Sequence, residues 1–114
     1  MAEVKLVVAY PRPRDISDFE RSYLNEHMPM ARAKLSGATK IVLTKIVDSA
    51  DGSIPPFHRI AEIYFPSMEA LQTCVATEGA KQTVAHAISI SNGGPPLFMI
   101  AESETITVDA RAVA

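Results

Sequence analysis

The 114 residues are enough for one domain with a single hydrophobic core and too few for two. Hydrophobic residues make up 47% and charged residues 21%, as in globular chains, and a net charge of −2 argues against a nucleic-acid binder, which usually carries a basic stripe. The apolar N-terminal run is too short for a signal peptide or a membrane span, and one cysteine excludes an intramolecular disulfide. We therefore expect a cytoplasmic protein without nucleic-acid or membrane partners.

The first half of the chain predicts a strand followed by two helical pieces. Residues 3–10 alternate and are rich in β-branched side chains, which is typical of a strand. Asp15 or Ser17 can cap the next helix, whose Phe19, Tyr23 and His27 are spaced by four and share one face. Pro29 disfavours continuation of that helix, so we expect it to stop near His27 and a second short helix to begin at the proline.

The second half predicts two strands, a helical region and a last strand. The strands are residues 39–48 and 58–65, joined by a long loop. Ser67 can cap a helix with a buried stripe of Met68, Leu71 and Val75, and residues 80–91 favour another short helix. The last strand is predicted at 97–108. The order βαββαβ indicates an α+β domain over residues 1–108, an open antiparallel sheet with helices on one face, and a loose tail at 109–114.

Both faces of this predicted sheet are apolar. The third strand places Ala61, Ile63 and Phe65 on one face and Ile60, Glu62 and Tyr64 on the other. Because the helices cover only one face, the second apolar face needs a partner. We therefore predict a homodimer in which two sheets pack face to face.

Three segments resemble the EthD-like family, within the dimeric α+β barrel (ferredoxin-like) superfamily. They are YPRPRDISDFERSYLNEHMPMARAKLSG, PPFHRIAEIYF, and NGG before the last strand. The resemblance covers nearly the whole chain and implies a small dimer with a pocket between helices and sheet in each protomer. Similar proteins include cofactor-free monooxygenases, muconolactone isomerases, polyketide cyclases and dehydratases, and haem-degrading enzymes. One scaffold hosts many reactions, so the resemblance does not specify the reaction.

His27 is the candidate catalytic residue. It falls at the His of the family's H-x-P segment, which in lactone-isomerising relatives is placed for proton transfer, and imidazole is suited to acid–base chemistry near neutral pH. The structural alternative is that His27 only binds a free carbonyl at the helix end.

The candidate substrate-binding residues lie around His27 in the family's segments. Tyr10 and Tyr23 could orient a carbonyl group through their hydroxyls, or be amphipathic residues at the edge of the core. Glu62 could be a buried base, although an ion pair at the dimer interface with Arg59 or a partner lysine is favoured. The full set is Tyr10, Phe19, Tyr23, His58, Glu62 and Tyr64, with His58 expected at the mouth of the pocket and Tyr64 more a packing residue than a proton donor.

The remaining polar residues favour neither a metal nor a reactive thiol. The histidines lack the paired spacing of a zinc site, and nothing in the sequence near Cys74 would lower its pKa, so we expect core packing there. His86 stands near the position where the family often carries an Asp. Haem handling, with His27 or His86 as axial ligand, is the least favoured possibility.

Two hypotheses for the function follow. The first is a cofactor-independent enzyme, of oxidoreductase, isomerase or dehydratase type, that acts on a small apolar or aromatic carbonyl compound by proton transfer at His27. The second is a non-enzymatic accessory or ligand-binding protein on the same scaffold. Neither the substrate nor the choice between oxidation, isomerisation and dehydration follows from the residues.

Overall fold

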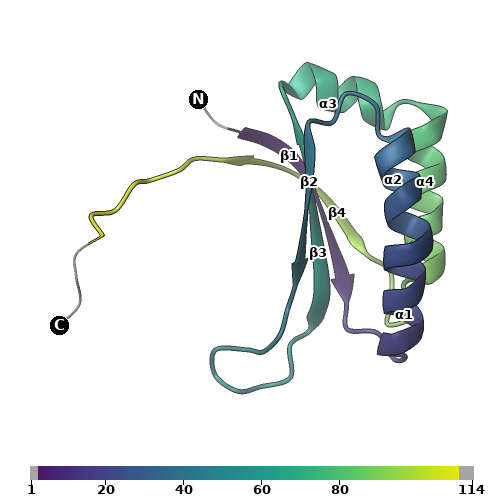
Figure 1. The fold of residues 1–114 in the computed structure, drawn as a ribbon, viewed down its shortest axis with the longest axis vertical. Coiled ribbons are helices and arrows are strands. Elements are labelled where there is room, and N and C mark those ends of the chain that lie inside the picture. The colour runs from purple at the N-terminus through teal and green to yellow at the C-terminus, as the bar shows by residue number, and fades with distance from the viewer. Residues whose placement is uncertain (1–2, 111–114) are drawn as a thin grey trace.

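The computed structural model describes residues 3–110 and shows a ferredoxin-like fold, with helices on one face of an antiparallel sheet (Figure 1). The sheet order is β2-β3-β1-β4, so β2 and β4 are the edge strands. The strands are β1 Glu3–Pro11, β2 Lys40–Lys45, β3 Phe57–Phe65 and β4 Leu97–Ser103. The predicted βαββαβ order and the one-sided helical layer are confirmed.

The helical layer begins where side chains cap the exposed backbone N–H groups. Asp15, Ser67 and Thr77 each accept a hydrogen bond from the backbone N–H three residues later. The helical segments are α1 Ile16–Ser22, a π-helical turn η1 Tyr23–His27, α2 Met28–Lys34, α3 Met68–Val75 and α4 Glu78–Ile90. No helix in the described part of the chain is both long and apolar enough to cross a bilayer.

The predicted boundary at His27 is present, since η1 ends at His27 and α2 begins at Met28, but the expected stop is wrong because the backbone stays helical through Pro29. His27 and Met28 both have helical dihedral angles, and Met28 donates its N–H to the carbonyl of Tyr23, five residues earlier. This wider turn passes directly into α2, where Pro29 occupies the first turn and its missing N–H is tolerated. The proline therefore accompanies a π-helical turn, a feature often found at functional sites.

The core fills the space between the sheet and the helices. Leu6, Val8 and Tyr10 of β1 lie on the same face of the sheet as Ala61 and Ile63 of β3, and all five are buried. Aromatic and apolar side chains of the helices complete the cluster, namely Phe19, Tyr23, Leu71 and Cys74. The expected packing role of Cys74 is confirmed, and burial raises the pKa of its thiol.

Two predictions for the second half of the chain need correction. Val75 was expected in the buried stripe of α3, but it is 39% exposed because Cys74 shares the inward face with Leu71. The last strand ends at Ser103 rather than Val108, and Ser103 is paired with Glu3, where the described part of β1 begins. Residues 104–110 have no regular structure and extend away from the sheet on the side opposite the helices (Figure 1).

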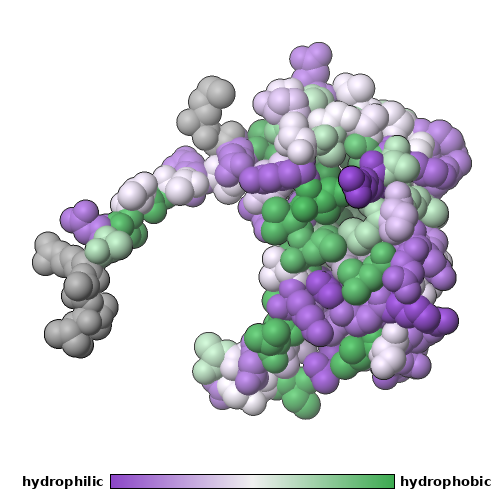
Figure 2. Space-filling model, viewed as in Figure 1, coloured by the Kyte–Doolittle hydropathy of each residue, from purple (hydrophilic) through white to green (hydrophobic). Residues whose placement is uncertain are grey.

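The sheet face away from the helices, here called the outer face, forms one wall of a hollow. Figure 2 shows apolar atoms on this wall, with the C-terminal segment above it and the loop between β2 and β3 below it. Exposed apolar side chains on this face include Val42, Leu97 and Met99. A paired Lys5 and Glu62 lie on the same face. The predicted two-sided apolar sheet is therefore present in the fold.

Candidate functional site

The π-helical turn and β1 bring two predicted site residues into contact at His27. The ring of His27 is 4% exposed, and its Nε2 lies 3.2 Å from the hydroxyl of Tyr10. The rings of Phe19, Tyr23 and His27 follow one another along the inner face of the helix. Tyr23 stacks on Phe19 with centroids 5.2 Å apart and on His27 with centroids 6.1 Å apart. These aromatic contacts fix the orientation of the imidazole.

A second histidine, His86 of α4, binds the other ring nitrogen of His27. The two Nδ1 atoms are 2.9 Å apart, and the rings stack with an interplanar angle of 12°. On the far side of His86, Nε2 lies 3.7 Å from Oε1 of Glu26, whose side chain is 60% exposed. Tyr10, His27, His86 and Glu26 therefore form a chain of polar groups from the core to the surface, which we call the Tyr10–Glu26 chain.

The end groups of the Tyr10–Glu26 chain indicate which of its atoms donate hydrogen bonds and which accept them. An ionised carboxylate only accepts hydrogen bonds, so Glu26 favours a proton on Nε2 of His86. Nδ1 of a neutral His86 is then an acceptor, and His27 donates its Nδ1–H to it. Nε2 of His27 is left as an acceptor for the O–H of Tyr10. The basic nitrogen of His27 thus faces the buried side.

Burial and a neighbouring imidazole affect the pKa values of these groups. Desolvation lowers the pKa of His27 to about 4, and the electrostatic effect of His86 acts in the same direction. Burial also raises the pKa of Tyr10 far above its usual value. At neutral pH, His27 is therefore an uncharged base and Tyr10 an uncharged hydrogen-bond donor.

A small apolar cavity adjoins His27 between the helices and the sheet. Its volume is about 30 Å³, which is room for about two water molecules. Tyr10, His27 and Thr83 supply its polar side chains. Its apolar lining is Leu6, Val8, Met28, Ala31, Leu35, Ile41, Ala61, Ile63, Val84, Ala87 and Phe98. A site with few polar groups in an apolar wall is suited to a small, mainly apolar molecule.

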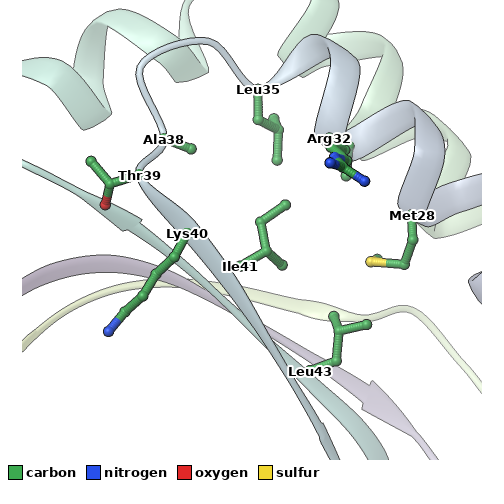
Figure 3. A pocket seen from close by; sticks show the side chains of 9 residues that line it. Met28, Arg32, Leu35, Ala38, Thr39, Lys40, Ile41 and Leu43 are labelled. Atoms are coloured by element: carbon green, nitrogen blue, oxygen red, sulfur yellow. The ribbon is translucent and has the colours of Figure 1, made fainter.

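A larger groove of about 390 Å³ lies next to the cavity, between α2 and β2. In Figure 3, Leu35, Ile41 and Leu43 point into the space between helix and strand, whereas Lys40 points away from it. Met28, Ala31, Leu35 and Ile41 line both the groove and the cavity. The cavity and the groove are therefore neighbours that share part of their apolar lining.

The other predicted site residues lie apart from His27. Glu62 and Tyr64 are on the outer face, where Glu62 pairs with Lys5 of the same chain rather than with Arg59. The ammonium group of Lys40 lies 4.4 Å from the ring centroid of Tyr64. These two residues therefore cannot reach a molecule in the inner cavity.

His58 is buried rather than placed at a pocket mouth. It is the extra residue where the pairing of β1 and β3 shifts, and it packs edge-on against Phe19. Its Nε2 lies 3.3 Å from Oε2 of Glu20 but lacks the geometry of a hydrogen bond. The hydroxyl of Tyr23 is also buried and has no hydrogen-bond partner in the described part of the chain; its pKa is raised to about 12 by burial. Both residues belong to the packed end of the core.

His86 is the functional candidate that sequence reasoning did not place in the site. Its contact with His27 joins residues 59 positions apart, so no local spacing could reveal it. The available signal was that the family often carries a carboxylate near this position. Within residues 3–110, no group of three or more His, Cys, Asp or Glu side chains is arranged to hold a metal ion.

Comparison with known families supports the expected relationship. The EthD domain matches residues 13–87, which include most of the helical layer and all of β2 and β3. The chain belongs to the EthD family. A crystal structure of an EthD family protein from Bacillus halodurans is 31% identical, with a TM-score of 0.82 over 90% of this chain and 99% of that one. An uncharacterized 11.0 kDa protein of Rhodococcus erythropolis is 26% identical over 90% of this chain and 96% of its own length.

More distant structures share the fold alone. A dimeric ferredoxin-like protein of unknown function from Jannaschia is 13% identical, with a TM-score of 0.61 over 90% of this chain and 99% of that chain. SnoaB, a cofactor-independent oxygenase from Streptomyces nogalater, is 12% identical, with a TM-score of 0.61 over 97% of this chain and 100% of that chain. The ferredoxin-like architecture of the EthD domain is thus shared with proteins of very low sequence identity.

Proposed function

We propose that this EthD protein is a cofactor-independent enzyme in which His27 removes a proton from a small apolar or aromatic carbonyl compound. The observation that carries the proposal is the Tyr10–Glu26 chain, which sets a neutral, buried imidazole against an apolar cavity. An imidazole that is uncharged at neutral pH has a ring nitrogen free to accept a proton, and the contact with His86 offers a destination for its other ring proton. The proposal is supported by SnoaB, which shares the fold and is a cofactor-independent oxygenase.

In the proposed reaction, the substrate enters from the α2/β2 groove by displacing the side chains of Met28 and Leu35. The hydroxyl of Tyr10 turns from His27 to the carbonyl oxygen of the substrate and stabilises the negative charge that develops there. Nε2 of His27 takes the proton from the carbon next to the carbonyl. The Nδ1 proton of His27 passes to His86, and Glu26 stabilises the charge at the surface end.

The resulting enolate could be reprotonated at another carbon, lose a leaving group or react with O₂. These outcomes correspond to isomerisation, dehydration and oxidation, which share the same first step. The proposal therefore concerns proton abstraction, and the second step depends on the substrate.

The first experiment is a thermal-shift screen of the wild-type protein against small aromatic acids, lactones, quinones and polyketide-like phenols, because ligand binding to the folded state raises Tm. Each compound that binds and that carries a hydrogen on the carbon next to its carbonyl is then incubated in D₂O with wild type, His27→Gln and Tyr10→Phe. NMR follows exchange of deuterium into the carbon next to the carbonyl. We expect the His27→Gln rate to fall by about 10²- to 10⁴-fold. Tyr64→Phe, on the outer face, serves as the matched control for Tyr10→Phe.

Exchange that proceeds equally fast in His27→Gln would overturn the catalytic role of His27. Binding without exchange or conversion, unchanged in His27→Gln, would instead favour a non-enzymatic ligand-binding protein. The two functions therefore give different results in the same assay.

We also propose that two copies pack through their outer faces to form a homodimer. Support comes from the apolar wall of the hollow in Figure 2 and from β4, where Leu97, Phe98, Met99 and Ile100 are all at least 36% exposed. A run of apolar residues exposed on both faces of an edge strand is a liability unless another chain covers it. The Jannaschia protein that shares this fold is dimeric.

A further inference from the structure

In the part of the chain that the structure describes, the groove between α2 and β2 holds a cation, Arg32, without an acidic partner. Arg32 is exposed and lines the groove. Within residues 3–110, no Asp or Glu forms an ion pair with it, and the first turn of α2 contains no acidic residue. A guanidinium presents its N–H donors in a planar fork that fits a carboxylate in a bidentate contact. Arg32 is therefore free to bind an anionic group of a molecule in the groove.

The other polar side chains that line the groove are already engaged. Lys40 points away from it, and its ammonium group lies 3.9 Å from Oε2 of Glu3 and 4.4 Å from the ring centroid of Tyr64 (Figure 3). The hydroxyl of Thr39 donates to the backbone carbonyl of Tyr64 at 3.2 Å. Arg32 is thus the polar side chain left for a ligand, and the rest of the lining is Met28, Ala31, Leu35, Ala38, Ile41 and Leu43.

The position of Arg32 on α2 sets its distance from the base. Arg32 comes four residues after Met28, so the two side chains share a face of the helix. Met28 and Ala31 line both the groove and the cavity at His27. From His27 to Arg32 the helix rises by roughly 7.5 Å. Figure 3 shows Leu35, Arg32 and Met28 in succession along the wall of the groove. A molecule lying along α2 therefore has the base near one end and the cation near the other.

We propose that the site takes an oxo acid, with its carbonyl group at Tyr10 and His27 and its carboxylate at Arg32. The apolar part between these two groups lies against Leu35 and Ile41. This inference rests on the proposed proton abstraction and adds the substrate class to it. Because the carboxylate is held at a fixed distance from the base, the ion pair also selects which carbon of the molecule faces Nε2 of His27.

The test uses straight-chain methyl ketones that differ only at their far end. One series is the oxo acids from 4-oxopentanoate to 9-oxodecanoate, and the other is the ketones in which a methyl group replaces the carboxylate. Isothermal titration calorimetry gives Kd for each compound with wild type and with variants at Arg32. The effect of the Arg32 variants should be largest for 7-oxooctanoate, whose five methylene groups span a distance close to the helical rise of roughly 7.5 Å. Its matched ketone is 2-octanone.

Arg32→Met removes the charge, and Lys34→Met is its matched control. Lys34 is also exposed on α2, but its ammonium group donates to Gln82 and it does not line the groove. We expect Arg32→Met to raise the Kd of 7-oxooctanoate by about fivefold or more, because a charged hydrogen-bond donor to the carboxylate is lost. The Kd of 2-octanone with Arg32→Met, and both Kd values with Lys34→Met, should change by less than about twofold.

A charge reversal tests the same contact by gain of binding. Trimethyl(6-oxoheptyl)ammonium carries a cation at the end of the same five-methylene spacer. Arg32→Glu should bind this compound about fivefold more tightly than wild type does, and 7-oxooctanoate at least fivefold more weakly, because the sign of the groove charge is reversed. A variant that had lost only its fold would weaken the binding of both compounds.

The outcomes separate this inference from the function on which it rests. If no acid of the series binds wild type, or if Arg32→Met and Lys34→Met change every Kd equally, the oxo-acid class is overturned. His27-dependent deuterium exchange into any other compound would then leave the proposed proton abstraction standing. Binding of 7-oxooctanoate that depends on Arg32, with no His27-dependent exchange next to its carbonyl, would uphold the acid site and overturn the proton abstraction.

Discussion

At the scale of single residues, the sequence indicated the base but not its partner. His27 could be singled out because it stands in the helical stripe with Phe19 and Tyr23 and two positions before Pro29. The contact between His27 and Tyr10 agrees with the sequence analysis, because both residues were among the candidate site residues. His86 was missed because its stacking on His27 depends on the packing of α4 against the turn, which no local pattern encodes.

The burial of His27 predicts a specific dependence of stability on pH. Its pKa is about 4 in the fold, against about 6.5 in an unfolded chain. Between these values the unfolded state binds more protons, so the free energy of unfolding falls as pH decreases from 6.5 to 4. Relative to pH values below 4, the neutral imidazole of His27 adds about 3 kcal/mol to the free energy of unfolding. This stabilisation is fully present above pH 6.5. Urea titrations across this range measure it.

His27→Gln provides the control for this pH dependence, because glutamine does not titrate. The difference in unfolding free energy between wild type and variant should shrink as pH falls through this window. Parallel pH curves for the two proteins would show that His27 is not held neutral by burial.

At the scale of elements, the hydrophobic pattern located the strands and helices, but Pro29 was misleading. Proline rules are local, whereas the η1 turn is stabilised by the stacking of Tyr23 on His27 and by the fit of the helix to the sheet. The position of α1 relative to β3 depends on another long-range contact. Arg59 donates two hydrogen bonds to Glu20, of 2.7 and 3.1 Å, and holds the pKa of that carboxyl below its usual value.

Removal of this contact should loosen α1 from the sheet. Arg59→Met leaves Glu20, whose side chain is 19% exposed, with only His58 at 3.3 Å and Lys45 at 3.9 Å. We expect a loss of about 2–4 kcal/mol in the free energy of unfolding at pH 7, measured by urea denaturation, because a largely buried carboxylate loses its main partner.

The double variant Glu20→Gln/Arg59→Met removes both charges, so it should cost less than Arg59→Met alone. Arg21→Met is the exposed control, since Arg21 and Asp18 are more than half exposed and such pairs contribute about 1 kcal/mol or less. Equal effects of Arg59→Met and Arg21→Met would show that the Glu20 contact does not hold α1 in place.

At the scale of the whole molecule, alternation along the strands predicted correctly that both faces of the sheet are apolar. It could not show that β4 is exposed on both sides, because that follows from its place at the edge of the sheet order. Nor could it show where β4 ends, since that depends on its pairing with β1, a contact between distant parts of the chain. These features leave the molecule with an apolar hollow bounded by residues 104–110 and the β2–β3 loop (Figure 2).

The outer-face dimer can be tested by placing charges inside this hollow. Val42 and Met99 lie on the outer face, on β2 and β4, and both are more than a third exposed. In a face-to-face dimer, Val42→Asp/Met99→Asp would bury four unpaired carboxylates of like charge around the symmetry axis, each at a cost of several kcal/mol. Light scattering at micromolar concentration should therefore give twice the 12.3 kDa chain mass for wild type and a single chain mass for the variant.

Leu24→Asp changes a similarly exposed apolar residue on the helical layer and should leave the dimer intact. A double variant that stays dimeric would move the interface away from the outer face, whereas dissociation by Leu24→Asp alone would place it on the helices.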